Sequence, residues 1–307
     1  MVICTLEKIG SGKVRDIYAV TPNVPIASSE LIGFVATDRV SVNDNIVGEI
    51  PGRGRLLNLI SNFWKKKISR YGIIDNDLFP NIEVGGIKDD ISIVKKAIPI
   101  PIELIVRNIL TGSIYNEYQR NDSKTGKYLD IELPAGLKEW DFLPKVSITP
   151  TTKAALGKKD EPICYKNVVD IINTLIIENK SFFGNTIHDI PEDYAEMIYS
   201  VSLQIFDLAN QDLQKRGIIL VDTKFEFGFI RTELGIRLIL IDEVLTPDSS
   251  RFILEKEYNN GIISHLSKQT LRNWILKNPG QSLSEEIKKI VYQEYYSIYE
   301  RIVKIPS

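Results

Sequence analysis

Sulfur and histidine are scarce in this sequence. The chain has 2 Cys, 2 Met and 2 His among 307 residues. Cys4 and Cys164 lie far apart and form no metal-binding or redox spacing, which favours a reduced, cytoplasmic compartment. With His188 and His265 as the only imidazoles, neither a histidine-rich metal site nor a histidine-centred catalytic triad is expected.

Long apolar runs and a surplus of one charge are also missing. No stretch reaches the roughly 18 apolar residues of a membrane span, and Glu7 and Lys8 stand where a signal peptide would be apolar. Lys and Arg number 38 against 40 Asp and Glu, so neither nucleic acid nor a membrane is an expected partner. An anionic ligand would therefore be bound by local basic residues.

Apolar periodicity predicts a mixed chain of helices and strands. Short β-branched runs predict strands near residues 14–20, 33–37, 91–97 and 102–108. Helices are predicted over 55–71, over 191–217 and after a capping-box pattern, SLSE, at 282–285. Residues 121–161 are polar and contain several Gly and Pro, which predicts a long irregular segment.

Two segments of the C-terminal half combine apolar strands with buried-looking charge. Residues 217–229 and 238–252 are joined by a short polar turn, which predicts a β-hairpin. Glu226 and Asp242 on its adjacent strands could hold one Mg²⁺ and leave positions open for phosphate oxygens. The alternative is a solvated face of ion pairs, in which Lys224 neutralises its neighbours. The TPDSSRF sequence that ends the second segment adds hydroxyls and an arginine, and it favours an anion site.

Three further segments could bind anions. GSGKVRDIY (10–18) lacks the Walker A order, and its better analogy is a glycine-rich hairpin over nucleotide phosphates. IELIVRNILTGS (102–113) leads a strand into Arg107 and a Thr-Gly-Ser turn. TPTTKA (149–154) adds hydroxyls and Lys153, which suit a carboxylate-bearing ligand. A simple turn, a structural arginine and a solvated loop are the respective alternatives.

Taken in order, these motifs resemble the SAICAR synthetase family of purine biosynthesis. The resemblance covers nearly the whole chain and also includes ATDRVS, DTKFEFG, DEVLTPDSSRF and SKQTLRNW. The length and the GLKE insert (136–139) are similar to the longer, single-function form found in fungi. The implied α/β (α+β) fold is related to ATP-grasp enzymes and protein kinases. An N-terminal antiparallel sheet domain is expected over 1–105, and a larger C-terminal α/β domain over 106–307.

The resemblance implies an ATP-dependent carboxylate–amine ligase. Its substrates would be L-aspartate, ATP and carboxyaminoimidazole ribonucleotide (CAIR), and its products SAICAR, ADP and phosphate, with Mg²⁺ as cofactor. A carboxylate is a poor electrophile, so ATP would activate it as an acyl phosphate before the aspartate amine attacks. Positioning and charge stabilisation would supply most of the catalysis, in line with the lack of a conventional nucleophile. A monomer is favoured, while an oligomer remains open.

Roles for individual residues also follow from the resemblance. The ATP phosphates would be faced by Gly12, Lys13 and Arg15, and the adenine by the strip from Lys95 to Pro99. The metal ligands would be Glu226 and Asp242. The ribonucleotide phosphate would be held by Arg107, Ser113 and Arg251. Catalytic roles are expected for Lys224, near the reacting carboxylate, and for Arg251 and Asp222. Other substrate contacts would come from Asp38 and Arg39, and aspartate contacts from Thr152, Lys153 and Asp160.

Some features of the sequence leave alternatives. Asn43, Arg53 and Lys159 depart from the family pattern, and the last of these bears on aspartate recognition. Asp222 or Asp38 could take the proton of the aspartate amine. A kinase of the related fold is disfavoured because no HRD, DFG or APE motif occurs. A nucleotide-binding regulatory protein would have lost acidic or basic positions, and no such loss is visible.

Overall fold

The fold is described from a computed structural model of the chain. The description covers residues 2–23, 31–42, 45–78, 82–84, 91–120, 126–153, 160–184 and 190–304. Asn43 and Lys159, two of the positions that depart from the family pattern, lie outside these ranges.

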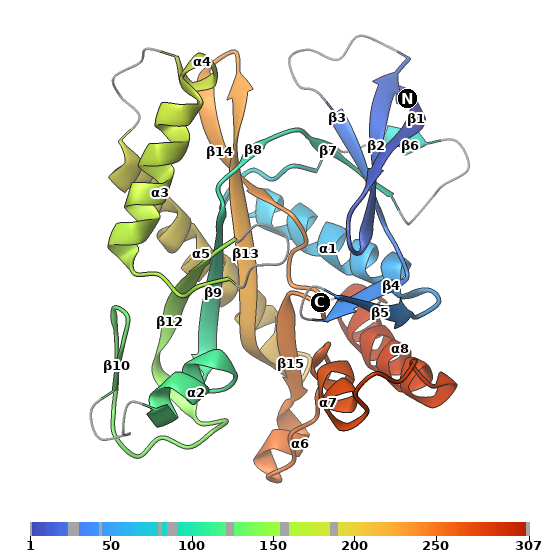
Figure 1. The fold of residues 1–307 in the computed structure, drawn as a ribbon, viewed down its shortest axis with the longest axis vertical. Coiled ribbons are helices and arrows are strands. Elements are labelled where there is room, and N and C mark those ends of the chain that lie inside the picture. The colour runs from blue at the N-terminus through green and yellow to red at the C-terminus, as the bar shows by residue number, and fades with distance from the viewer. Residues whose placement is uncertain are drawn as a thin grey trace.

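The N-terminal part is built on a five-stranded sheet with the order β6-β1-β2-β3-β7 (Figure 1). Its strands are β1 (Val2–Ser11), β2 (Arg15–Pro22), β3 (Leu31–Ala36), β6 (Ile82–Val84) and β7 (Ile91–Lys95). All neighbours are antiparallel except β1 and β6. A separate ribbon pairs β4 (Arg39–Val42) with β5 (Asn45–Glu49). The predicted strands at 14–20, 33–37 and 91–97 are confirmed to within a few residues.

Helix α1 (Arg53–Arg70) confirms the helix predicted over 55–71. It buries apolar side chains three or four residues apart, which is the spacing of one helical face. The helix starts very close to the end of β3, since a Cβ on Gly54 would lie 2.2 Å from the carbonyl oxygen of Ala36. Asp38 fixes this start, because its carboxylate accepts from the backbone N–H groups of Gly52 at 2.9 Å and Gly54 at 3.0 Å.

A second, six-stranded sheet forms the centre of the molecule. Its strands are β8 (Ile98–Pro99), β9 (Ile102–Ile109), β12 (Phe142–Thr152), β13 (Ile218–Thr232), β14 (Gly235–Ile241) and β15 (Ser250–Leu254). The order is β12-β9-β13-β14, and β8 and β15 pair with the two ends of β13. Helices α3 (Tyr165–Glu178) and α5 (Pro191–Gln214) cover one side of this sheet and bury the largest apolar cluster (Figure 1).

Two predictions about this sheet were wrong in part. The segment 121–161 is not irregular throughout, since it contains β12, paired with β9. The prolines at 144 and 150 hid this strand, but an edge strand tolerates them because one of its sides needs no ladder hydrogen bonds. The predicted hairpin is present as β13 and β14, whereas residues 250–254 form a separate strand, β15, that pairs with the first half of β13.

The remaining helices and strands complete the described part of the chain. They are α2 (Ser113–Arg120), β10 (Gly126–Tyr128), β11 (Ile131–Leu133), α4 (Lys180–Phe183), α6 (Glu255–Asn259), α7 (Gln269–Lys277), α8 (Glu285–Tyr299) and a π-helical turn at Glu300–Lys304. The capping residue of α8 is Ser284, whose hydroxyl accepts from the N–H of Ile287 at 3.3 Å, and not Ser282 as the SLSE pattern suggested. Across the described ranges, no helix is long and apolar enough to span a bilayer.

The last helix returns to the N-terminal part of the molecule. Helix α8 lies beside α1 and the β4–β5 ribbon (Figure 1). Together they enclose a second buried cluster, of which Leu56 and Leu57 on α1 and Val291 and Tyr295 on α8 are members. The α+β fold class is confirmed, and this packing links α1 and the β4–β5 ribbon to the C-terminal helices.

Candidate active site

The glycine-rich segment forms the tight connection between β1 and β2. The N–H of Gly12 donates to the carbonyl oxygen of Arg15 at 2.6 Å. Arg39 stabilises the turn. Its guanidinium donates to the carbonyl oxygens of Lys13 and Gly12, each at 3.1 Å, and to the carboxylate of Asp16 at 2.7 Å. Arg39 therefore holds the backbone of the turn that is predicted to face the nucleotide phosphates.

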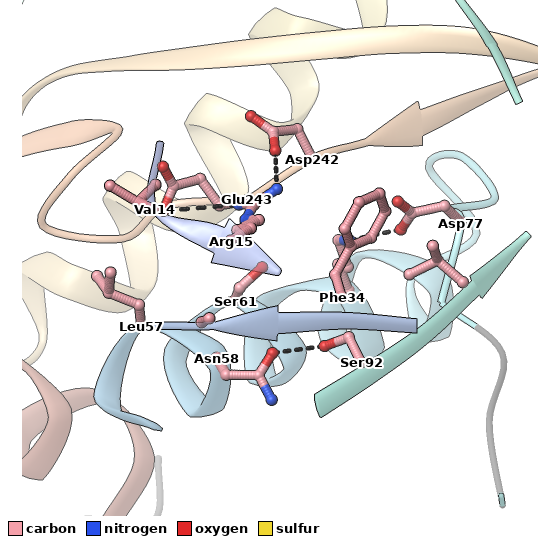
Figure 2. Close-up of a pocket in the computed structure, with 13 residues that line it drawn as sticks. Val14, Arg15, Phe34, Leu57, Asn58, Ser61, Asp77, Ser92, Asp242 and Glu243 are labelled. Carbon is pink, nitrogen blue, oxygen red and sulfur yellow. Dashed lines mark hydrogen bonds and ion pairs between the residues drawn. The ribbon is translucent and has the colours of Figure 1, made fainter. Parts of the chain in front are cut away.

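Arg15 points into a cavity between the N-terminal sheet and α1 (Figure 2). Its guanidinium donates to the carboxylate of Asp242 and lies 4.0 Å from Glu243. Burial alone would lower the pKa of Arg15, but these two carboxylates outweigh it and raise the pKa. The cavity thus brings a cation predicted to face phosphates into contact with a predicted metal ligand. A buried ion pair between Lys65 and Asp77 lines the same space.

Glu226 and Asp242 come together on β13 and just after β14. Glu226 is 2% exposed and accepts from Lys224 at 2.7 Å and from Lys153. Asp242 lies 3.9 Å from Lys224. Burial and the Asp242 charge raise the pKa of Glu226. Burial would also raise the pKa of Asp242, but Arg15 and Lys224 lower it, so Asp242 carries the negative charge of the pair more readily.

This carboxylate pair fits a Mg²⁺ ion that arrives with phosphate ligands. In the part of the chain that the structure describes, no group of three or more His, Cys, Asp or Glu could hold a metal by itself. Mg²⁺ is usually bound through one or two carboxylates together with waters and substrate phosphates. Two acids surrounded by cations match that pattern better than they match an all-protein metal cage.

A second cavity of about 410 Å³ lies beside the first half of β13, where Asp222 and Lys224 line it. The predicted phosphate ligands Arg107, Ser113 and Arg251 line it. Arg107 donates to Ser113 at 3.0 Å and to Asp222 at 3.1 Å. Arg251 makes a two-point contact with the same Asp222, with its Nε at 2.9 Å. Burial would raise the pKa of Asp222, but Arg251 and Arg107 together lower it. The two guanidinium groups are thereby held side by side against one buried carboxylate.

Gly112 allows this arrangement. It has a φ of +68°, and a Cβ there would lie 2.8 Å from Arg251 Nη1. Only glycine adopts the backbone angle easily and leaves room for the guanidinium.

One predicted aspartate contact shares a cleft with predicted nucleotide contacts, and two others do not line it. Lys153 lies in a cleft of about 900 Å³ that Gly12, Lys13 and Arg15 also line. The Thr152 hydroxyl accepts from the N–H of Glu161 at 3.0 Å, and Asp160 is exposed.

Lys95 and Pro99 lie where the chain passes from the N-terminal sheet to the central one. The N–H of Lys95 donates to the carbonyl oxygen of Asp77 at 2.8 Å, and Pro99 pairs with Gly228 of β13. Neither belongs to the lining of the cavities described above. Their predicted place beside the adenine, like the predicted aspartate contacts, stays a prediction.

Sequence reasoning gave no role to several residues of the site. Glu103 accepts from Lys224 at 2.7 Å and lines both the cleft and the second cavity. Lys268 and Arg272 line the same two spaces. Lys268 directly precedes α7 and Arg272 lies in its first turn, so their spacing of four residues places both on one side of the helix start, but only the tertiary fold shows which way that side turns.

An α+β fold whose cleft combines a carboxylate pair with lysines and arginines is typical of enzymes that bind strongly anionic substrates. The SAICAR synthetase family profile matches residues 8–290. Two relatives are named phosphoribosylaminoimidazole-succinocarboxamide synthases. That of Halorhodospira halophila is 34% identical, over 95% of this chain and 93% of its own. That of Schizosaccharomyces pombe is 36% identical, over 96% and 93%. The chain therefore belongs to the SAICAR synthetase family.

Solved structures agree with this membership. The SAICAR synthase of Saccharomyces cerevisiae, solved in complex with SAICAR, is 30% identical, with a TM-score of 0.75 over 98% of this chain and 96% of that one. A SAICAR synthetase solved with ADP shares the fold, with a TM-score of 0.65 over 99% of both chains at 22% identity. The share of this chain that aligns is similar for the bacterial relative, 95%, and for the two fungal ones, 96% and 98%. The resemblance to the longer form is therefore not limited to fungi.

Proposed function

We propose that the chain joins L-aspartate to the carboxylate of CAIR, with ATP converted to ADP and phosphate. The observation that carries this proposal is the placement of Lys224 between two spaces. It lines the cavity that holds Arg107 and Arg251, and it also lines the cleft that holds the carboxylate pair. A phosphorylated substrate in the cavity would then direct its reacting end toward a nucleotide in the cleft.

Different residues would bind the phosphate, stabilise the developing charge and hold the metal in such a reaction. The two arginines and Ser113 would grip the ribonucleotide phosphate, because guanidinium groups bind phosphate through paired hydrogen bonds. Lys224 would stabilise negative charge on the activated carboxylate as the phosphoryl group leaves ATP. Glu226 and Asp242 would hold Mg²⁺, which neutralises the phosphates when bound. Stabilisation by fixed charges would provide most of the rate enhancement.

Both carboxylates considered for the amine proton are engaged in other contacts. Asp222 has a lowered pKa and is paired with two arginines. Asp38 already accepts two backbone N–H groups at the start of α1. A carboxylate with a lowered pKa removes protons less effectively near neutral pH. We propose that Asp222 orients the two arginines and does not itself take the proton.

A coupled ADP-release assay tests the reaction. Purified protein is given Mg²⁺-ATP, CAIR and L-aspartate, and each component is omitted in turn. ADP release at the full rate should require all of them. Release that needs a single acceptor besides ATP would indicate a kinase, and nucleotide binding without turnover would indicate a regulatory protein. Either result would refute the ligase assignment.

The metal assignment has its own test in Glu226→Gln. The substitution keeps the shape of the side chain but removes one of two charges that would hold Mg²⁺. We expect turnover to fall by at least about a hundredfold, with far-UV circular dichroism unchanged. Glu233→Gln is the matched control, because Glu233 is exposed at the turn of the same hairpin. Near wild-type turnover in Glu226→Gln would refute the metal role.

A further inference from the structure

Four polar side chains meet beside the two ligand spaces, and each comes from a different part of the chain. Asp248 and Lys268 line both the cavity and the cleft, whereas Arg53 and Tyr295 line neither. Arg53 begins α1, Asp248 lies between β14 and β15, Lys268 precedes α7 and Tyr295 is on α8. Asp248 is the centre of this group. It contacts Arg53, accepts from Lys268 at 2.9 Å and accepts from the Tyr295 hydroxyl at 2.6 Å. The side chains of Arg53 and Asp248 are 1% and 4% exposed.

The charges of this group depend on one another. Burial would raise the pKa of Asp248, but Arg53 and Lys268 outweigh it and lower the pKa. The Arg53 guanidinium also lies over the Tyr295 ring, 5.8 Å from its centroid. Breaking a buried pair by removing one partner strands the other charge in a poorly solvated site. The four side chains therefore depend on one another for their placement.

One side of the group leads to the glycine-rich turn. Arg53 donates through Nη1 to the carbonyl oxygen of Arg39 at 2.9 Å. The Arg39 guanidinium in turn donates to the carbonyl oxygens of Gly12 and Lys13. Two arginines in series thus join Asp248 to the backbone of the turn predicted to cover the nucleotide phosphates.

On its other side the group reaches the cavity of about 410 Å³ that holds Arg107 and Arg251, called the ribonucleotide cavity after its proposed ligand. Lys268 lines that cavity, and its ammonium group is held by Asp248. The backbone N–H of Lys268 donates to the carbonyl oxygen of Pro247 at 3.0 Å, which fixes the start of α7 to the same loop. A shift of Asp248 would therefore move a cavity cation and the glycine-rich turn together.

We propose that Asp248 is a positioning residue that, with Arg53 and Tyr295, couples the nucleotide turn to the ribonucleotide cavity. Binding in either space would hold the shared group in its arrangement and so strengthen binding in the other. Tyr295 makes the C-terminal helix part of this coupling, although it lines neither space. The identity of the two ligands rests on the proposed function, whereas the coupling of the two spaces rests on the contacts above.

Tyr295→Phe is the sharpest test, since it removes one hydroxyl and keeps the ring in place. We would measure by calorimetry the dissociation constant of a non-hydrolysable Mg²⁺-ATP analogue, with and without saturating CAIR. In the wild type the ratio of the two constants should be at least fivefold. In Tyr295→Phe it should fall at least threefold, while affinity for each ligand alone changes less than twofold. Tyr296→Phe on the same helix is the control, because its hydroxyl accepts only from the exposed Lys304 among the contacts described.

A second measurement does not depend on the ligands. Hydrogen exchange at the amides of residues 12–15 in the free protein should be faster in Tyr295→Phe than in Tyr296→Phe. A wild-type protein that binds neither ligand would refute the proposed function, and the exchange comparison would still decide the positioning role. A lower unfolding midpoint in Tyr295→Phe, with the affinity ratio and the exchange unchanged, would mean that the group only stabilises the fold. That outcome would overturn the coupling.

Discussion

A single residue can fix the position of a charged side chain from a distant part of the sequence. Gly112 illustrates this, because its lack of a side chain lets the Arg251 guanidinium lie against the Thr-Gly-Ser turn. The arginine has little freedom to move elsewhere, since it is also bound to Asp222. If the cavity binds a phosphate as proposed, its affinity would depend on a residue that has no functional group.

Gly112→Ala should weaken binding of the ribonucleotide. The new methyl group would push Arg251 away from its position, and we expect a loss of about tenfold in CAIR affinity, or about 1.4 kcal/mol. Calorimetry with CAIR would measure it. Gly136→Ala is the control, because Gly136 also has a positive φ, +84°, but has no atom within 4 Å of the added Cβ. Equal losses of affinity in both variants would show that backbone strain, and not the position of Arg251, is responsible.

The types of residue at the site could be predicted from sequence better than their partners could. Glu226 and Asp242 were predicted to lie together because both sit where a hairpin strand meets charge. The contact of Lys153 with Glu226 could not be predicted, because the two residues are 73 positions apart and no local pattern joins them. Long-range pairs of this kind arise only when the sheet orders its strands.

At the scale of elements, one partly buried carboxyl group joins α7 and α8 in addition to their apolar packing. Glu294 on α8 accepts from the Thr270 hydroxyl on α7 at 2.8 Å, and its other oxygen has no hydrogen-bond partner among the described residues. Burial raises the pKa of Glu294 to about 7, although the Thr270 hydrogen bond acts in the opposite direction. The folded protein therefore holds this proton more tightly than the unfolded chain does.

The protein should lose stability at this site as the pH rises. The contribution of Glu294 is fully present below its ordinary pKa of 4.5 and is lost as the pH passes about 7. Glu294→Gln mimics the protonated form, so its free energy of unfolding should exceed that of the wild type by about 2 kcal/mol at pH 8. At pH 4.5 the two should be nearly equal. Urea unfolding at both pH values measures the difference.

Glu286→Gln serves as the comparison for this prediction, since Glu286 is exposed on the same helix. It should follow the wild type at both pH values. Parallel stability curves for Glu294→Gln and the wild type would mean that Glu294 is ionised in the folded protein near neutral pH, and the argument from burial would be wrong.

Helices and strands differed in how well the sequence predicted them. Helix α1 was predicted to within two residues because its apolar residues recur on one face and Gly72 follows directly. Strand β12 was missed because Pro144 and Pro150 are unfavourable in most strands, and only its position at the sheet edge permits them. Edge position is a property of the sheet, which no local window of sequence contains.

Across the whole molecule, the proposed boundary between residues 105 and 106 divides two parts that depend on each other. Half of the ten buried residues in the cluster around α1 come from residues 271–295. Backbone hydrogen bonds also join the parts, with Leu240 donating to Asp75 at 2.9 Å and Asp77 donating to Leu240 at 3.0 Å. The periodicity of each helix was readable from sequence, but the partner that its apolar face contacts was not.

A fragment of residues 1–105 should not fold alone. It would expose the apolar face of α1 that α8 covers, and a chain of this size depends on burying most of its core. Circular dichroism and amide NMR dispersion of the fragment should indicate an unfolded chain, and addition of residues 106–307 should restore structure. Cooperative thermal unfolding of the isolated fragment would contradict this expectation and would support two independently stable domains.

The spacing of side chains along β13 limits where members of this family can gain or lose residues. Asp222, Lys224 and Glu226 are two residues apart and belong to one face of the strand, so about 13 Å of backbone separates the ribonucleotide side from the metal side. Inserting or deleting one residue between them would turn every later side chain to the opposite face. Relatives that keep the reaction should therefore differ along this stretch by substitution alone, and gain or lose residues only in the surrounding loops.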